Sequence, residues 1–220
     1  MGDIKKNKCL VEIYDGVTIV DEQIRLLQEC GINDICITTG SYAGKLENYL
    51  REQHSANFTF VYNPLYRETN YIYSIYLALD HLSGDFIMMH GDLLFEKSLL
   101  AEVINYSESS MVIDYKKPLP EKDFKAVIAE GKITAVGVNY FENAVYAQPL
   151  YKLFLKDWLL WSAEITRFCQ EGNRSVYAEN ALNIKLSPID AAGRYCFEVD
   201  DENDLKFARE MFQKDIVKLK

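Results

Sequence analysis

The chain has 220 residues, of which 49% are hydrophobic and 26% are charged. These values are typical of a globular protein with a substantial core. The formal net charge of −9 argues against a nucleic-acid groove, because phosphate backbones require clustered Lys and Arg. No apolar run approaches the ~20 residues that cross a bilayer, so we expect neither a nucleic acid nor a membrane as partner.

The cysteines point to a reducing compartment. Their number is odd and no C-x-x-C pair occurs, so the sequence indicates neither a zinc site nor a disulfide framework. The polar segment 1–8 is not a secretory signal. We therefore predict a cytoplasmic protein. The five cysteines are Cys9, Cys30, Cys36, Cys169 and Cys196.

Strand and helix patterns alternate over the first two-fifths of the chain. This β-α-β repetition predicts a parallel sheet with helices on both faces. The unbroken apolar, β-branched run at 34–39 is typical of a strand buried on both faces. The expected strands are 8–13, 34–39, 57–62 and 85–90, and the expected helices are 20–30, 44–53 and one from about 70 to 82.

The second half has a different character. Glu130-Gly131 is a candidate tight turn between two strands. Because the sequence contains no linker or repeat, we predict a single domain, 1–220, with an embedded antiparallel portion. The expected strands are 111–115, 124–129, 132–139, 183–186 and 195–199, and the expected helices are 152–170 and 201–214.

Acidic side chains follow two of the predicted strands. Asp92 comes after the strand at 85–90, and Glu198 and Asp200 come at the end of the strand at 195–199. Ligands of open α/β sheets bind at the carboxyl ends of strands, and carboxylate oxygens suit Mg²⁺. Each segment also has a simpler interpretation, namely a Gly-Asp turn at 91–92 and helix capping by Asp200 or Asp201.

Three further segments carry polar groups of interest. Asn70 and Ser74 lie at a predicted helix start, where free amides can bind a base edge, although an N-cap without ligand is the alternative. Lys8 lies beside the first predicted strand, where a cation would neutralise phosphate, although a lone Lys is usually just solvated. Glu179 and Asn180 follow Tyr177, a combination that suits a cationic head group such as choline, or simply an ordinary turn.

In their order along the chain, these segments resemble the bacterial choline-phosphate cytidylyltransferases and their sugar-phosphate nucleotidyltransferase relatives. The resemblance covers nearly the whole chain and is loose at about 100–170. It implies a Rossmann-like, three-layer α/β/α (GT-A-like) fold with a mostly parallel sheet. The matching segments are NKCLVEI at 7–13, DEQIRLLQECGINDICITTG at 21–40, NPLYRETNYIYSIYLA at 63–78, Asp92, EVD at 198–200 and DENDLKFAREMF at 201–212.

The resemblance also implies a reaction. CTP binds with Mg²⁺, a substrate phosphate oxygen attacks the α-phosphorus in line, and pyrophosphate leaves. Carried over by position, Asp92 and Asp200 would hold the metal and Lys8 would meet phosphate oxygens. Gly40, Asn70 and Ser74 would lie near the base. Glu179 and Asn180 are the expected acceptor side, with phosphocholine or a similar small phosphate or phosphonate as acceptor.

The family pattern begins with an AIILAAG-type strand and a glycine-rich phosphate loop, and neither is found in these 220 residues. The first residues, MGDIKKNK, resemble the stretch just after that loop, with Met1 as the methionine of its "RMG" pattern. We expect either a start codon assigned too late or a naturally shortened gene. The activity of the chain itself is therefore left open.

The sequence leaves other functions in competition. A sugar-1-phosphate nucleotidyltransferase is one, and a non-catalytic nucleotide-binding or regulatory remnant is another. A glycosyltransferase of similar architecture is a weaker third, because such enzymes carry a D-x-D motif and His90-Gly91-Asp92 lacks its first acid. Base preference, acceptor and oligomeric state, including a homodimer, stay open.

Overall fold

The computed structural model of the protein describes residues 7–218, and for 214–218 it describes the backbone only. The prediction about Met1 lies outside these residues. Six α-helices and twelve strands are described. The helices are α1 (Ile19–Glu29), α2 (Ala43–Gln53), α3 (Tyr71–Ala78), α4 (Lys97–Asn105), α5 (Leu155–Gln170) and α6 (Glu202–Lys218), with 3₁₀ turns η1 (Lys8–Leu10), η2 (Leu79–His81) and η3 (Ala178–Ala181).

The strands form one larger sheet and three pairs. The larger sheet has the order β11-β7-β10-β8-β9, and β5 also pairs with β10. The pairs are β1-β2, β3-β4 and β6-β12. The strands are β1 (Glu12–Tyr14), β2 (Val17–Thr18), β3 (Asp34–Thr39), β4 (Asn57–Tyr62), β5 (Phe86–Met89), β6 (Leu93–Phe95), β7 (Ser110–Asp114), β8 (Lys125–Ala129), β9 (Lys132–Gly137), β10 (Ala144–Leu153), β11 (Ser187–Asp190) and β12 (Cys196–Glu198).

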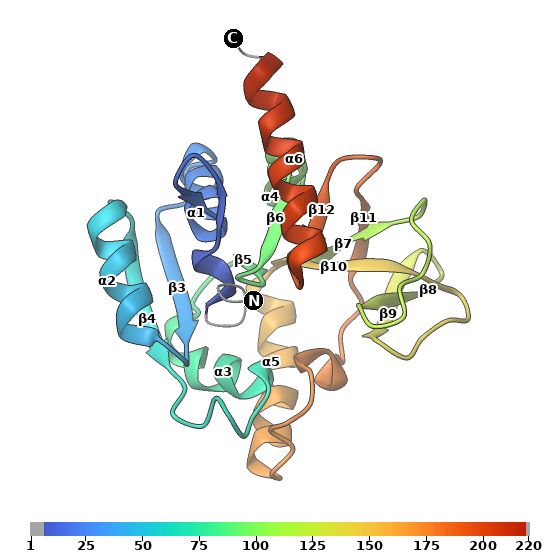
Figure 1. The fold of residues 1–220 in the computed structure, drawn as a ribbon. Helices are drawn as coiled ribbons and strands as arrows, with labels where there is room; N and C mark the ends of the chain where they lie inside the picture. Colours follow the sequence, from blue (N-terminus) through green and yellow to red (C-terminus); the bar gives the residue numbers. More distant parts are fainter. Residues whose placement is uncertain (1–6, 219–220) are drawn as a thin grey trace.

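Strand directions agree with the predicted fold class. β3 and β4 are parallel, as are β7 and β11, and β5 runs in the same direction as β7 because both are antiparallel to β10. β8 and β9 form the small antiparallel portion, to the right in Figure 1. Their turn is the predicted Glu130-Gly131, where both residues have positive φ.

Helices cover both faces of the sheet. On one face, α3 and α5 enclose a core that includes Trp158, Trp161 and Tyr151. On the other face, α1 and α4 pack with β6 and β12 around residues such as Leu27 and Leu100. The predicted three-layer α/β/α architecture is therefore confirmed, and Figure 1 shows α2, β3 and β4 on the opposite side of the molecule from β8 and β9.

Most elements predicted for the first half are present, although β2, β6 and α4 were not predicted. Two of the predictions are wrong. The strand expected at 8–13 is wrong, because Lys8–Leu10 form a 3₁₀ turn and only Glu12–Tyr14 are extended. The expected double burial of 34–39 is also wrong, since Thr39 is its only buried residue. β3 pairs with β4 alone among the described strands, so its other edge is uncovered.

The second half differs more. The strand expected at 183–186 lies instead at Ser187–Asp190, and the helix expected from 152 begins at Leu155. Residues 152 and 153 belong to β10, which the sequence interpretation missed although it is the strand that joins β5, β7 and β8. Pro149 argues against a strand in the sequence pattern, because proline cannot donate a ladder hydrogen bond. The pairing with β7 shifts between Gln148 and Tyr151, and this bulge accommodates the proline.

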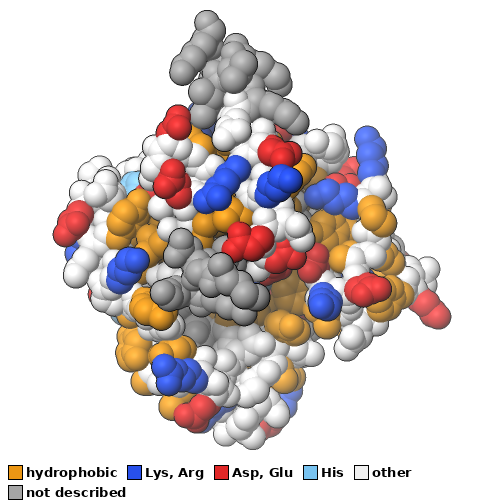
Figure 2. Space-filling view, in the orientation of Figure 1, with side chains coloured by type: hydrophobic (Ala, Val, Ile, Leu, Met, Phe, Trp, Pro, Cys, Tyr) orange, Lys and Arg blue, Asp and Glu red, His pale blue; other side chains and the backbone are white. Residues whose placement is uncertain are grey.

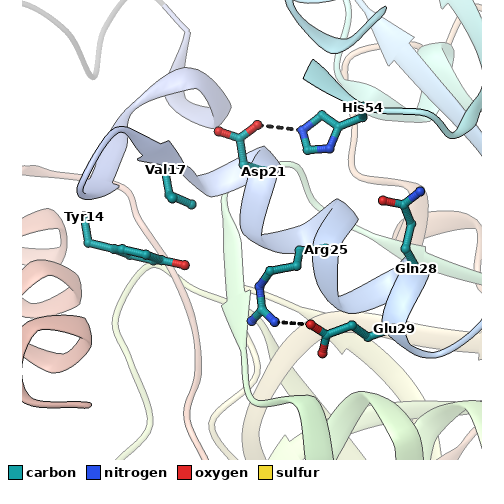
Figure 3. A pocket seen from close by; sticks show the side chains of 7 residues that line it. All are labelled: Tyr14, Val17, Asp21, Arg25, Gln28, Glu29 and His54. Carbon is teal, nitrogen blue, oxygen red and sulfur yellow. Dashed lines mark hydrogen bonds and ion pairs between the residues drawn. The ribbon is translucent and has the colours of Figure 1, made fainter. Parts of the chain in front are cut away.

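A network of hydrogen bonds fixes the start of α1. Thr18 and Asp21 form a capping box, in which each side chain accepts from the other residue's backbone N–H. Asp21 also binds the Tyr49 hydroxyl at 2.6 Å and His54 Nε2 at 2.7 Å. Figure 3 shows the hollow beside this network, where Arg25 and Glu29 are also paired. Burial alone would raise the pKa of Asp21, but these hydrogen bonds hold that pKa below its ordinary value.

We expect Asp21→Asn to lower the free energy of unfolding by about 1–2 kcal/mol at pH 7, the usual cost of a lost helix cap. Because the folded pKa of Asp21 lies below 3.8, this contribution is present above pH 3.8 and is lost as the pH falls through the folded value. Urea unfolding at pH 7 and pH 3 measures both effects. Asp80→Asn, at an exposed site, is the control, and an equal loss in both variants would contradict the assignment.

Candidate active site

The pairing of β6 with β12 brings two distant acidic segments together. Glu198 lies opposite Leu93 in this antiparallel pair, and the N–H of Val199 donates to the carbonyl of Asp92 at 2.9 Å. The segment 90–92 at the end of β5 therefore lies beside 198–200. The predicted proximity of Asp92 and Asp200, far apart in the sequence, rests on this contact.

Lys8 bridges the two aspartates. Its ammonium lies 3.1 Å from Asp92 Oδ2 and also contacts Asp200 Oδ1. Burial alone would lower the pKa of Lys8, but the hydrogen bonds and charges of the two carboxylates raise it above 10.5. Lys8, Asp92 and Asp200, three residues singled out from the sequence, thus form one cluster.

A second group adjoins this cluster. His90 Nδ1 lies 2.7 Å from Glu198 Oε1, and ligand atoms of His90, Asp92 and Glu198 lie within 4.8 Å of one another. Burial raises the pKa of Glu198, and the hydrogen bond and charge of His90 partly oppose this rise. For His90, burial alone would lower the pKa, but Glu198 and neighbouring carboxylates raise it above 6.5. Oxygen and imidazole donors at this spacing fit a divalent cation.

Four aromatic rings form a closed set of contacts next to the carboxylates. Tyr71 contacts His90 with ring centroids 4.8 Å apart, and His90 contacts Phe124 at 6.1 Å. Phe124 contacts Tyr177 at 5.2 Å, and Tyr177 returns to Tyr71 at 6.1 Å. We call these four residues the aromatic cluster. Tyr177 is 37% exposed, so the cluster is open to solvent at this ring.

A buried carboxylate lies beside the aromatic cluster. Glu179 is 4% exposed and accepts hydrogen bonds from the hydroxyls of Tyr71 and Tyr151. Burial, followed by the charge of Glu179, raises the pKa of both phenols well above 10, so the phenols stay protonated donors. Within the part of the chain whose side chains are described, Glu179 has no Lys or Arg partner. A buried carboxylate without a cation is costly, which makes this position attractive to a positively charged ligand.

The remaining predicted residues have local structural partners. Asn70 caps α3 by accepting from the N–H of Tyr71, as the simpler interpretation required. Ser74 accepts from Asn63, and Asn180 accepts from the N–H of Tyr177. A Cβ at Gly40 would lie 2.8 Å from Cβ of Tyr66, so only glycine fits there. Contact of these residues with a base or acceptor stays a prediction.

The simpler interpretation of the acidic segment also holds in part. Asp201, not Asp200, caps α6, since it accepts from the backbone N–H groups of Asn203 and Asp204. Asp200 is thereby free to face Lys8. Sequence reasoning missed Tyr71, Phe124 and Tyr151 as members of the site, because nothing in the sequence brings three aromatics from separate elements together.

On the face drawn in Figure 2, basic side chains lie interspersed with acidic ones and form no continuous basic area. No helix within residues 7–218 is both long and apolar enough to span a bilayer.

We expect an NMR titration of His90, in chelator-treated buffer, to give a pKa above 6.5. Glu198→Gln should lower this pKa, because burial then acts without the partner carboxylate. Glu202→Gln, an exposed change at the start of α6, is the control and should leave it unchanged. A wild-type pKa at or below 6.5, or no response to Glu198→Gln, would contradict the described pairing.

Sequence comparison identifies relatives with related chemistry. The chain is 29% identical over 112 residues to a CTP:phosphoglutamine cytidylyltransferase of Campylobacter jejuni, covering 48% of this chain and 43% of the relative. It is 33% identical over 89 residues to a choline-phosphate cytidylyltransferase of Streptococcus pneumoniae, covering 40% and 37%. The matched regions thus span about two-fifths of each relative's length.

Structural comparison supports the fold. The inositol-1-phosphate CTP transferase from T. maritima superposes with a TM-score of 0.76 at 18% identity, covering 91% of this chain and 84% of that protein. The sequence model of the MobA-like NTP transferase domain matches residues 1–180, which is most of the chain. The protein therefore belongs to the MobA-like family of nucleoside triphosphate transferases, and the predicted nucleotidyltransferase family is confirmed.

Proposed function

We propose that the protein transfers a cytidylyl group from CTP to phosphocholine or to another small phosphate ester with a cationic head group. The observation that carries this proposal is the aromatic cluster beside Glu179. Quaternary ammonium groups bind over aromatic faces, and a nearby carboxylate adds charge attraction. The cytidylyltransferase relatives from two bacteria support CTP as donor.

The carboxylate cluster supplies the phosphate side of the proposal. We propose that Asp92 and Asp200 hold Mg²⁺, with ligand atoms of Glu198 and His90 within 4.8 Å of one of Asp92. The oxygen donors fit this hard cation, which would neutralise charge on the nucleotide phosphates when bound. Asp92 and Asp200 would then no longer need Lys8 as their counter-ion, and its ammonium would be free to meet phosphate oxygens.

The reaction then needs positioning more than covalent chemistry. An acceptor phosphate oxygen attacks the α-phosphorus of CTP, the bond to the β-phosphate oxygen breaks, and pyrophosphate leaves. Lys8 would stabilise the negative charge on the phosphates, and the aromatic cluster would hold the acceptor's head group. Asn70, Ser74 and Gly40 stay proposed neighbours of the base, and Asn180 of the acceptor. The odd cysteine number supports a reducing cytoplasm as the setting.

Competing acceptors separate the candidate functions. With CTP and Mg²⁺, product formation should be greatest with phosphocholine. It should fall roughly 10- to 30-fold in kcat/KM with 3,3-dimethylbutyl phosphate, which has the same shape without the charge, since a desolvated cation–π contact contributes up to ~2 kcal/mol. Preference for a sugar-1-phosphate would favour that alternative. CTP binding without turnover of any acceptor would favour a non-catalytic module.

We expect Tyr177→Leu to raise KM for phosphocholine several-fold and to leave KM for the neutral isostere nearly unchanged, because the substitution removes an aromatic face but keeps an apolar surface. Tyr140→Leu, at an exposed site outside the aromatic cluster, is the matched control and should change neither value. An equal rise of KM for both acceptors in Tyr177→Leu would contradict a cation-binding role for the cluster.

A further inference from the structure

A groove of about 1380 Å³ lies between β3 and β5. Residues 32–38 line one wall and residues 85–92 the opposite wall. Side chains of α1, such as Ile24 and Leu27, close one side, and side chains of α3, such as Ile75 and Ala78, close the other. The groove is therefore bounded by two strands and two helices, like the space that a strand occupies inside a sheet covered on both faces.

The main chain of β3 has free groups along this groove. The carbonyls of Asn33 and Thr39 accept hydrogen bonds from the β4 side. Because peptide groups alternate along a strand, the N–H and C=O groups of Asp34, Cys36 and Thr38 point the other way. β3 pairs with no described strand other than β4, so these groups face the groove.

The main chain of β5 offers a matching edge. The N–H of His90 donates to the carbonyl of Pro149 in β10, and Met88 lies opposite Tyr151. By the same alternation, the peptide groups of Ile87 and Met89 point away from β10. β10 is the only partner of β5 among the described strands, so the second wall of the groove is also an unpaired edge.

The two edges run in the same direction. A short turn at 30–33 joins α1 to β3, so β3 runs back along α1. Gln23, in the second turn of α1, donates to the carbonyl of His90 at 2.9 Å, which places the carboxyl end of β5 beside the beginning of that helix. The carboxyl ends of β3 and β5 therefore lie at the same end of the groove, where Cys9 and Asp92 also line it.

The size and polarity of the groove match one extended strand. A strand of six residues is about 20 Å long and, with spacings of 4.8 Å between strands and 10 Å between layers, occupies roughly 1000 Å³. All four residues of β5 are only partly buried, as are Ile35 and Ile37 of β3, which leaves apolar surface uncovered. A strand placed here would cover this surface and satisfy both rows of peptide groups.

We propose that this groove is a strand-acceptor site. Its occupant is an extended peptide segment of about six residues, aliphatic and β-branched on both faces, that pairs in parallel with β3 and β5 at once. Binding by added strands uses main-chain hydrogen bonds for affinity and side-chain packing for selectivity. The occupant's carboxyl end would lie beside Lys8 and Asp92, so strand addition would complete the sheet next to the carboxylate cluster.

Hydrogen exchange on the full chain tests this site. The probe is the peptide Lys-Val-Ile-Val-Ile-Val-Lys, added in excess and, in a second arm, fused ahead of the chain through a flexible Gly/Ser linker that raises its effective concentration. We expect at least tenfold slower exchange for the amides of Cys36, Thr38, Ile87 and Met89. Amides of α5, which contributes no residue to the groove lining, report any global change in stability.

A matched control separates strand pairing from apolar contact. The same peptide with N-methyl groups on its three valines keeps the side chains and loses the N–H donors toward one edge. It should protect the amides much less. Three results would overturn the proposal: no protection in either arm, equal protection by the N-methylated peptide, or protection that rises with protein concentration alone, which would indicate self-association of the chain.

Discussion

The antiparallel contact between β6 and β12 is the interaction on which the candidate site depends. It is short, yet the N–H of Val199 donating to the carbonyl of Asp92 fixes the ends of β5 and β12 against each other. Three carboxylates from segments about a hundred residues apart then share a small volume. Like charges this close repel, and the Lys8 ammonium and the His90 imidazole are the groups that offset this repulsion.

The same region divides naturally into two chemical halves. The carboxylate cluster with Lys8 is polar and half-exposed, which suits a metal ion and phosphates. The aromatic cluster and Glu179 are largely buried, which suits a cationic group. His90 belongs to both halves, since its ring contacts Tyr71 and Phe124 while its Nδ1 binds Glu198. The side chain of His90 thus couples the proposed phosphate and acceptor sides.

Sequence patterns predicted the fold class and singled out Lys8, Asp92 and Asp200, but they did not predict that Lys8 bridges the two aspartates. They failed where a long-range contact overrides a local rule. Pro149 argued against a strand at β10, because proline is rare inside sheets. In the structure, a bulge in the pairing with β7 accommodates it. The apolar run of β3 indicated burial on both faces. Burial also depends on which elements pack against the strand, and the residues of the run do not specify these. The aromatic cluster joins four separate segments, so no local pattern carries it.

The central claim is that Asp92 and Asp200 act together on a nucleotide-bound metal ion. Calorimetric titration of CTP into the wild type, Asp92→Asn, Asp200→Asn and the double variant, with Mg²⁺ and with chelator, tests it most directly. With Mg²⁺, each single change should weaken binding about tenfold or more, and the double variant should be little worse than either, because one shared ion is lost. With chelator, the variants should bind no worse than the wild type. Additive losses, or losses independent of Mg²⁺, would contradict the claim.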